Sequence, residues 1–176
     1  MQKSKNIICI QKYESPCGNL ILGSYEGKLC LCDWENDKHR NKIDKHLCKV
    51  FNAEYKEEKS PVILQAMKEL DEYFAQKRKE FDIPLLFIGT DFQKRVWQHL
   101  LSIPYGKTIS YKLMATQMQI PNSVRAVANA NGANAISIFA PCHRVIGHDN
   151  TLTGYGGGIE TKRYLLELED NTRLFK

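Results

Sequence analysis

Short apolar runs separated by turn-forming residues dominate the start of the chain. Segments 15–19 and 25–27 both contain Gly, and the first also contains Pro and Asn, which favour tight turns. We therefore expect a small antiparallel meander over residues 6–34. Residues 35–60 are charged and irregular, which predicts a variable surface loop. The three predicted strands are Asn6–Tyr13, Leu20–Ser24 and Lys28–Trp34.

A helical pattern follows this region. A proline in the first turn and apolar residues at three- and four-residue spacing predict a helix over residues 61–77. Residues 81–88 are apolar but contain a proline, so we expect an extended connector or an edge strand. The connector divides the chain into two predicted lobes, residues 1–88 and 89–176.

Three further helices are predicted after this connector. Thr90 and Gln93 form a capping-box pattern ahead of a helix that buries its apolar side. Ser110 caps a short helix that runs to about Met118. A third helix covers Ser123–Asn131 and ends at a glycine. The last two, joined by a short turn with Pro and Asn, resemble a helix-turn-helix. The buried residues expected in the first helix are Phe92, Val96, Trp97 and Leu100.

The third of these helices has an unusual exposed face. Its periodicity places Val124, Val127 and Ala128 inward. A solvated face normally carries several Lys and Glu, whereas this one offers a single guanidinium among small residues, which favours close approach to another molecule. An alanine-rich packing helix is the alternative. The residues expected on the exposed side are Arg125, Ala126, Asn129 and Ala130.

The residue spacing in the final predicted helix indicates a buried carboxylate. Over residues 159–169, Glu169 follows Leu165 by four positions and Leu166 by three, so it shares their inward face, whereas Glu167 is expected to be solvated. A buried acid needs a partner, and a histidine is a natural one. Two loops precede this helix: a polar turn in which Asn134 bonds local backbone, and the glycine-rich segment 154–158.

Composition and charge narrow the class of protein. The chain has 176 residues, 43% of them apolar, and no signal-peptide or membrane-span pattern. Six cysteines without a regular framework suggest free thiols in a reducing, intracellular compartment, and their spacing with His fits no zinc template. Charge is balanced over residues 1–89, but residues 92–148 hold six basic side chains and no acid. Such a stretch favours a polyanion as partner, although chance and solvated lysines could also explain it.

One segment carries candidate chemistry. In Pro141-Cys142-His143-Arg144-Val145 a thiol adjoins an imidazole and a guanidinium. Thiols react as thiolates, which nearby cations stabilise. Because neighbouring residues of an extended chain point opposite ways, a turn is needed to bring sulfur and imidazole together, and the proline can impose it. A structural buried cysteine is the alternative.

These segments together resemble the O6-alkylguanine-DNA alkyltransferases, also called methylated-DNA–protein-cysteine methyltransferases. The resemblance covers about half of the chain, in order, and the Pro-Cys-His-Arg-Val segment is its most specific part. The first lobe matches weakly, through Ser15-Pro16-x-Gly18. The matching segments are Thr90-Asp91-Phe92-Gln93-x-x-Val96-Trp97, Ile103-Pro104-x-Gly106-x-Thr108-x-Ser110-Tyr111, Arg125-Ala126-Val127, Pro141–Val145, Gly154-Tyr155-x-Gly157-Gly158 and Leu165-Leu166-x-x-Glu169.

The resemblance implies a catalytic set. Cys142 would accept an alkyl group from guanine O6, irreversibly and once per molecule. His143, oriented by Glu169, would take the thiol proton through a water. Tyr111 would donate a hydrogen bond to the departing guanine. Backbone carbonyls of Cys142 and Val145 and a backbone N–H near Gly156 would contact the base, while Tyr155 would pack on it and Asn134 would brace the site.

The resemblance also implies the partner and the fold. Arg125 would enter the stack of double-stranded DNA from the minor groove and replace the flipped nucleotide, with Ser123, Ala126, Ala130 and Tyr111 also at the DNA. The expected fold is α/β (α+β): a ribonuclease-H-like lobe with a small antiparallel sheet at 1–88, and a mostly helical lobe with a winged or helix-turn-helix motif at 89–176. No cofactor, metal, membrane or obligate protein partner is expected, and the chain is predicted to act as a cytoplasmic (or nuclear) monomer.

Four departures from the family pattern are visible. Ala128 and the pair Asn134-Ala135 replace residues that are usually Gly and Asn-Pro, and Gly156 stands where some members have Ser. Asn6 and Tyr25 occupy positions where zinc-binding relatives have ligands, so no zinc is expected. Two rival functions stay open at this point: a DNA-binding damage flag with an inert cysteine, and a thiol hydrolase that uses Cys142, His143 and Glu169.

Overall fold

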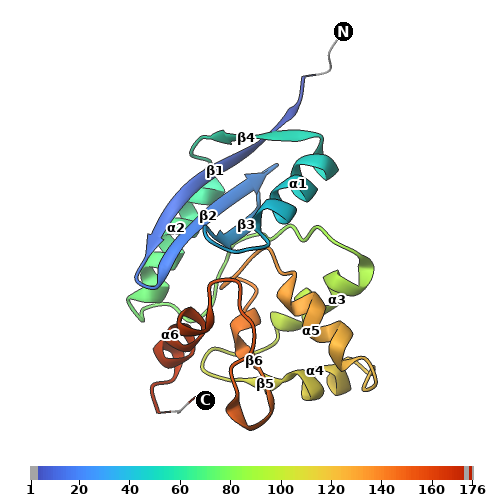
Figure 1. The fold of residues 1–176 in the computed structure, drawn as a ribbon. Helices are drawn as coiled ribbons and strands as arrows, with labels where there is room; N and C mark the ends of the chain where they lie inside the picture. Colours follow the sequence, from blue (N-terminus) through green and yellow to red (C-terminus); the bar gives the residue numbers. More distant parts are fainter. Residues whose placement is uncertain (1–3, 173–174, 176) are drawn as a thin grey trace. The chain divides into compact units, whose positions relative to one another are not determined.

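The structure, a computed structural model, describes residues 4–172 and 175. The chain divides into two compact units, Met1–Ile88 and Gly89–Lys176, each with its own interior (Figure 1). The predicted α/β (α+β) class is confirmed, with a mainly antiparallel sheet in the first unit and mostly helices in the second.

The first unit contains the predicted meander. Strands β1 (Asn6–Ser15), β2 (Gly18–Tyr25) and β3 (Lys28–Trp34) pair antiparallel in order. Helix α2 (Pro61–Phe74) begins where Ser60 accepts a hydrogen bond from the Ile63 amide at 3.3 Å, and it packs against the sheet. The interior of the first unit is built from large apolar residues that are fully buried, among them Ile8, Leu20, Leu22, Leu29, Leu31, Ile63, Leu70 and Tyr73.

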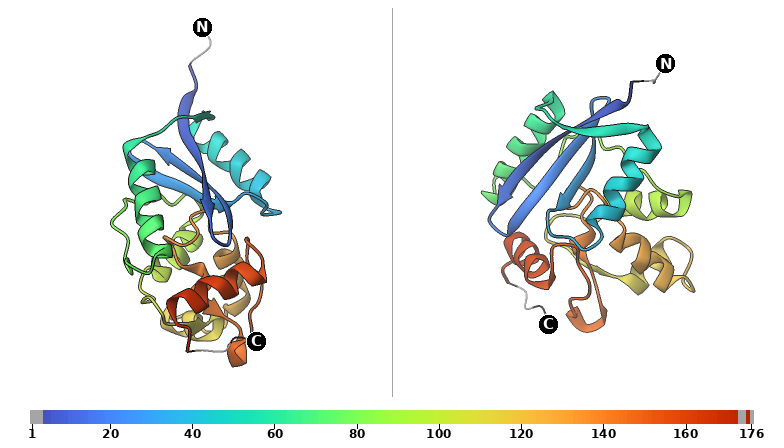
Figure 2. Two further views of the ribbon diagram at one scale, coloured as in Figure 1. Left: turned by 90° about the vertical axis from the view of Figure 1, so that its left-hand side faces the viewer. Right: turned by 45° about the horizontal axis from the view of Figure 1, so that its top comes forward.

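The prediction of an irregular loop over residues 35–60 is wrong. Helix α1 (Arg40–Phe51) and strand β4 (Ala53–Glu57) occupy it, and β4 pairs parallel with β1 at the edge of a four-stranded sheet. The left view of Figure 2 shows α1 and α2 on opposite sides of this sheet. The helix was missed because it is dominated by charged residues, has no side-chain N-cap and fully buries only Leu47.

The connector is partly strand-like. The Leu29 amide donates to the Pro84 carbonyl at 2.9 Å, and the Leu86 amide donates to the Leu29 carbonyl at 2.8 Å. Residues 84–86 therefore extend the edge of β3, in agreement with the expected extended segment.

The second unit begins with the predicted helices. They are α3 (Asp91–Leu100), α4 (Tyr111–Gln117) and α5 (Val124–Gly132). Both bonds of the Thr90–Gln93 capping box are present, and Ser110 caps α4 through the Leu113 amide. Val96, Trp97 and Leu100 are buried as expected, whereas Phe92 is only half-buried.

Two details of α5 correct the sequence analysis. Gly132 is the last helical residue and not a terminator beyond the helix, which is capped by Ala133. Ala130 was placed on the exposed face but is only 3% exposed. It lies three residues after the buried Val127, and its carbonyl accepts a hydrogen bond from Trp97 Nε1 at 2.8 Å, so it faces α3. Arg125, Ala126 and Asn129 are exposed as predicted.

A short sheet and a final helix complete the second unit. Strands β5 (Ile109–Ser110) and β6 (Val145–Ile146) pair parallel, with Ile109 opposite Val145. Two single-turn 3-10 helices, η1 (Cys142–Arg144) and η2 (His148–Asn150), flank β6. Helix α6 (Ile159–Glu169) has the predicted bounds, and in Figure 1 it lies across the small sheet from α3, α4 and α5.

Candidate active site

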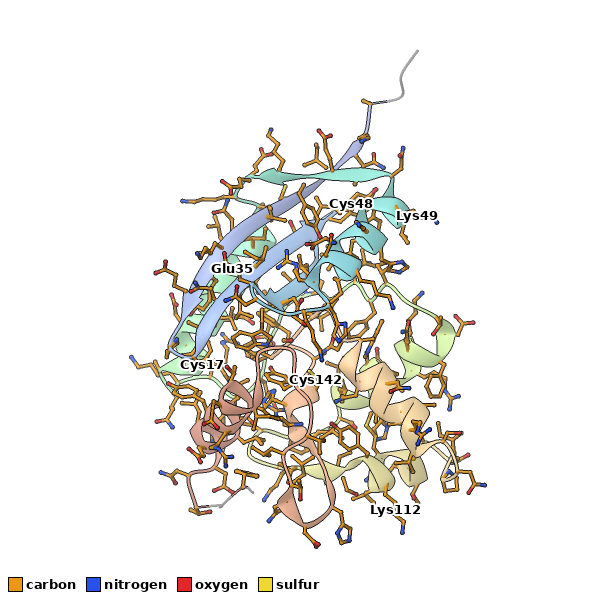
Figure 3. The ribbon with its side chains drawn as sticks, in the orientation of Figure 1. Cys17, Glu35, Cys48, Lys49, Lys112 and Cys142 are labelled. Carbon is orange, nitrogen blue, oxygen red and sulfur yellow. The ribbon has the colours of Figure 1, made fainter. Side chains whose placement is uncertain are left out.

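Cys142 lies just after a sharp turn. Its amide donates to the Ala140 carbonyl at 2.8 Å around Pro141, whose φ of −79° and ψ of 66° define an inverse γ-turn. The chain then enters η1, which contains Cys142, His143 and Arg144. The expected turn at Pro141 is present. Cys142 forms no disulfide and is 5% exposed, and Figure 3 labels it on the segment between α5 and β6.

The segment leading to Cys142 contains a strained residue. Ile138 has φ of 70°, a region that β-branched side chains rarely adopt, and the Phe139 amide bonds the Ser137 carbonyl across it at 2.8 Å. Asn134 fastens the segment at both ends. Its Nδ2 donates to the Ala140 carbonyl at 3.0 Å, and its Oδ1 accepts from the Ile136 amide at 3.0 Å. The prediction that Asn134 bonds local backbone is confirmed.

Glu169 is the centre of a buried polar network. Its side chain is 1% exposed, as the helical periodicity predicted, and His143 is a partner, with Nε2 of the imidazole 2.7 Å from Oε1. Arg144 adds a bidentate ion pair, donating from Nε to Oε2 at 2.9 Å and from Nη2 to Oε1 at 3.0 Å. Arg144 also donates from Nη1 to the Ile103 carbonyl at 2.6 Å.

This network fixes the protonation of His143. Burial alone would raise the pKa of Glu169, but its interactions with His143 and Arg144 lower it, so the carboxylate is ionised. Burial lowers the pKa of His143 and outweighs the opposing effect of Glu169, and the cations of Arg144 and Lys162 lower the pKa further. The imidazole is therefore neutral, and its Nε2 carries the proton donated to the carboxylate. Its Nδ1 holds a lone pair and is buried, without a hydrogen-bond partner among the described residues.

Gly106 supports the carboxylate from the other side. Its amide donates to Glu169 Oε2 at 3.3 Å, and its φ of 75° is left-handed. A Cβ at this position would lie 3.2 Å from the Glu169 carbonyl oxygen. Glycine is thus required both for the backbone conformation and for the close approach of α6.

A buried lysine, which the sequence analysis missed, lies beside the thiol. Lys162 is 0% exposed, and its Nζ donates to the carbonyls of Val145 at 2.8 Å and Thr153 at 3.0 Å. Burial lowers its pKa to about 8, although the charge of Cys142 opposes this. The periodicity that identified Glu169 also contained this signal, because Lys162 precedes Leu165 by three positions and Leu166 by four.

Tyr111 lies in the same cluster. It is the first residue of α4, and Lys162 Nζ lies 5.9 Å from the centre of its ring. Thr153 Oγ1 donates to its hydroxyl oxygen at 3.5 Å. Burial raises the pKa of the phenol, and the charge of Cys142 raises it further. The structure thus gathers Tyr111, Cys142 and Lys162 in one region and His143, Arg144 and Glu169 in an adjoining one.

The other predicted site residues lie on surface elements. Arg125 and Ala126 are exposed on α5, and Ser123 is half-buried ahead of it. Tyr155 is half-buried and Gly156 exposed in the loop before α6. Their roles toward DNA or a base stay predictions.

Two further observations concern metals and membranes. Within residues 4–172 and 175, no three His, Cys, Asp or Glu side chains are grouped so that they could hold a metal ion. No helix in the same part of the chain has the length and apolar character needed to cross a membrane.

Comparison with known proteins identifies the family. Residues 91–171 match the DNA binding domain of 6-O-methylguanine DNA methyltransferase, and residues 8–87 match its ribonuclease-like domain. A methylated-DNA–protein-cysteine methyltransferase from Methanosarcina barkeri is 42% identical over 158 residues, which cover 90% of this chain and 94% of that protein. The chain therefore belongs to the 6-O-methylguanine DNA methyltransferase family.

Two mycobacterial proteins extend this comparison. The protein of the same name from Mycobacterium bovis is 58% identical over 104 residues, which span 59% of this chain and 63% of that protein. OGT from Mycobacterium tuberculosis, solved in complex with DNA, superimposes with a TM-score of 0.79 at 42% identity and covers 92% of both chains. The similarity thus includes both units and is strongest over a part of the chain.

Proposed function

We propose that this protein repairs O6-alkylguanine in double-stranded DNA by transferring the alkyl group to its own Cys142. The observation that carries this proposal is the 2.7 Å hydrogen bond between His143 Nε2 and the buried Glu169 carboxylate. An ionised Glu169 fixes the proton on Nε2, so the buried Nδ1 lone pair is available to act as a base. The names of the relatives and the DNA bound to one structural neighbour support the same reaction.

The first step is removal of the thiol proton. His143 Nδ1 takes it from Cys142 through a water, and the imidazolium that forms is stabilised by Glu169 at 2.7 Å. Arg144 keeps Glu169 ionised, so the acquired proton stays on the imidazole. The neighbouring Lys162 ammonium stabilises the thiolate by its charge.

The second step is a single displacement. The sulfur attacks the alkyl carbon, a C–S bond forms, the C–O6 bond breaks, and its electron pair remains on guanine. Tyr111 donates a hydrogen bond to the departing base and so stabilises the developing negative charge. The thioether that forms on Cys142 is stable, so each molecule acts once. The proposed reaction uses no cofactor.

Recognition of the base uses backbone groups. The carbonyls of Cys142 and Val145 accept from the exocyclic amine, a backbone N–H near Gly156 bonds O6, and Tyr155 packs against the ring. Lys162 already donates to the Val145 carbonyl, but a carbonyl oxygen has two lone pairs and can accept a second hydrogen bond. The protein bond therefore orients this acceptor without consuming it.

DNA is bound through α5. Its exposed residues between Ser123 and Asn129 are small apart from Arg125, which fits close approach to a minor groove with one side chain inserted. Residues 92–148 contain no carboxylate to repel phosphates. Because Ala130 is buried against α3, it shapes this helix and does not belong to the proposed contact surface. The protein is proposed to act as a monomer.

Intact mass tests this proposal. The protein is incubated with duplex DNA that contains one O6-methylguanine, in parallel with Cys142→Ala and with Cys17→Ala, which removes another thiol that forms no disulfide. We expect a gain of one methyl group that stops at one equivalent, is retained in Cys17→Ala and is absent in Cys142→Ala. Unchanged mass with retained binding to the damaged duplex would favour the damage-flag function. Multiple turnover on a small ester would favour a thiol hydrolase.

A further inference from the structure

Thr153 contacts two groups of the site at once. Its backbone carbonyl accepts a hydrogen bond from Lys162 Nζ at 3.0 Å. Its side-chain hydroxyl donates to the phenol oxygen of Tyr111 at 3.5 Å. The ammonium and the phenol ring that it joins are themselves neighbours, with 5.9 Å between Lys162 Nζ and the centre of the Tyr111 ring. The reaction proposed above assigns no step to the Thr153 hydroxyl.

The backbone around Thr153 is held by three interactions. The Gly147 amide donates to the Thr151 carbonyl at 2.8 Å, which ties this segment to the end of β6. Leu152 is buried in an apolar cluster of the second unit. Lys162 holds the carbonyl of Thr153 itself. The Thr153 side chain is exposed, but it projects from a fixed backbone, so little conformational entropy is lost when its hydroxyl forms a hydrogen bond.

The direction of this hydrogen bond determines what the Tyr111 proton can do. A neutral phenol has two lone pairs and one O–H group. Because Thr153 donates, it occupies a lone pair and leaves the phenol O–H to donate to another group. The opposite direction would turn the phenol proton toward Thr153 and away from the departing guanine. Burial raises the pKa of Tyr111 and the hydrogen bond from Thr153 lowers it, which is the effect of donation to the phenol oxygen.

We propose that Thr153 is a positioning residue that holds the Tyr111 hydroxyl with its proton directed to the substrate base. This inference rests on the proposed alkyl transfer. When guanine departs with its electron pair, Tyr111 donates more strongly to the base and its oxygen becomes more negative. A donor already placed on that oxygen stabilises this charge as it develops. The backbone of the same residue orients Lys162, so one position aligns the phenol and the ammonium.

Three substitutions isolate the hydroxyl. Thr153→Val keeps the shape of the side chain without the donor, and Thr153→Ala replaces it if the valine variant does not fold. Thr153→Ser keeps the hydroxyl. Thr151→Val is the matched control, because it makes the same change at another exposed position of the segment.

Single-turnover methyl transfer is measured over a range of duplex concentrations. At 3.5 Å the hydrogen bond is long for two hydroxyl groups, so its expected effect is that of an ordinary neutral bond. We expect the rate at saturating DNA to fall about fivefold in Thr153→Val, with the half-saturating concentration unchanged. Thr153→Ser should recover most of this loss, and Thr151→Val should match the wild-type protein. A wild-type rate in Thr153→Val would overturn the proposal.

A spectroscopic measurement tests the direction of the bond. Tyrosine is labelled with 13C at the ring carbon that bears the hydroxyl, and the Tyr111 signal is identified by its loss in Tyr111→Phe. The charged groups that face the phenol, Cys142 and Lys162, are the same in every Thr153 variant. We expect the pKa of Tyr111 to be higher in Thr153→Val than in the wild-type protein and in Thr153→Ser. An unchanged pKa would overturn the proposal, and so would a lower one, which would show that Tyr111 donates to Thr153.

A double-mutant cycle completes the test. If Thr153 acts through Tyr111, then adding Thr153→Val to Tyr111→Phe changes the transfer rate by less than about twofold. An undiminished fivefold loss in that background would overturn the proposal, because Thr153 would then act on another group. Failure of the wild-type protein to take up methyl would refute the alkyl-transfer function, whereas the titration of Tyr111 would still decide whether Thr153 donates to it.

Discussion

Nε2 of His143 and Oε1 of Glu169 lie 2.7 Å apart in a buried environment, and Arg144 holds both oxygens of the same carboxylate. The guanidinium carries a permanent charge, so it keeps the carboxylate ionised. The carboxylate in turn fixes the imidazole tautomer. The proposed base at Nδ1 thus depends on two side chains that are adjacent in sequence, His143 and Arg144, and on an acid 26 positions after His143.

Glu169→Gln should disable both the site and part of the fold. The substitution removes the carboxylate charge and leaves the buried Arg144 guanidinium without a counter-ion. This should lower the free energy of unfolding by about 3 kcal/mol. It also frees the imidazole to change tautomer, so the rate of alkyl transfer should fall. Glu167→Gln, two residues away and exposed, is the control and should change neither quantity. Chemical denaturation and single-turnover transfer measure the two effects, and wild-type behaviour of Glu169→Gln would contradict the proposed role.

The transfer rate should depend on pH through His143. Burial lowers the pKa of its imidazole below the model-compound value of 6.5, so the neutral base predominates at pH 7. The rate should therefore stay constant as the pH falls to 6.5 and decrease only at a lower pH, where the imidazole becomes protonated. The same two groups affect stability, because the pKa values of Glu169 and His143 are both lower in the folded protein than in the unfolded chain. Their contribution to the free energy of unfolding is therefore complete above pH 6.5 and is lost as the pH falls. A single-turnover rate that already falls as the pH is lowered from 8 to 6.5 would contradict a base with a lowered pKa.

Lys162→Met should slow alkyl transfer, because it removes the cation beside Cys142 and the hydrogen bonds to Val145 and Thr153. Its effect on stability has a distinctive pH dependence. The lysine pKa is lowered from 10.5 to about 8, so the unfolded chain binds more protons between these values. Wild-type stability should rise relative to that of the variant across this window, by up to about 3 kcal/mol. Chemical denaturation of both proteins at pH 7.5 and at pH 10 measures their unfolding free energies. The same difference between wild type and variant at both pH values would contradict the prediction.

Arg125→Ala should impair repair of duplex DNA selectively. If this side chain fills the space left by a flipped nucleotide, transfer from duplex O6-methylguanine should fall about tenfold or more. Transfer from the free O6-methylguanine base needs no flipping and should be unchanged. Lys94→Ala removes the same charge from an exposed position of α3 and serves as the control. Equal loss on duplex and on free base would mean that Arg125 has another function.

Gly106→Ala should be more harmful than Gly27→Ala. The two glycines have nearly the same φ, 75° and 77°, so each substitution costs about 1–2 kcal/mol for the left-handed backbone. Only at Gly106 does the new Cβ crowd another group, the Glu169 carbonyl oxygen. We expect an additional loss of about 1 kcal/mol and slower alkyl transfer for Gly106→Ala alone. Thermal melts of both variants and a transfer assay decide the matter.

The sequence analysis was accurate where local signals were strong. The capping box at Thr90 and the cap at Ser110 placed α3 and α4, and the inward position of Glu169 followed from its spacing to Leu165 and Leu166. It failed over residues 40–57, where a helix with little buried surface and an edge strand owe their order to the neighbouring sheet. Local composition gives little indication of such elements.

Buried charges were the other difficulty. Arginine and lysine are rarely buried, so the burial of Arg144 and Lys162 is explained only by partners that are distant in sequence. The partners of Arg144 are Ile103 and Glu169. Those of Lys162 are Val145 and Thr153. The exposure of Ala130 was misjudged because an alanine fits either face of a helix, and the contact of its carbonyl with Trp97 decided the outcome.

The long separation between Gly106 and Glu169, 63 positions joined by one hydrogen bond, bears on how the protein is made. Synthesis proceeds from the amino terminus, and a domain generally folds as a unit. Cys142 and His143 are synthesised before α6, so until that helix is made the imidazole has no carboxylate to hold its proton and the lysine that faces the thiol is missing. We therefore expect the cysteine of an incomplete chain to be unassisted, and alkyl transfer to require that the last turn of α6 has docked.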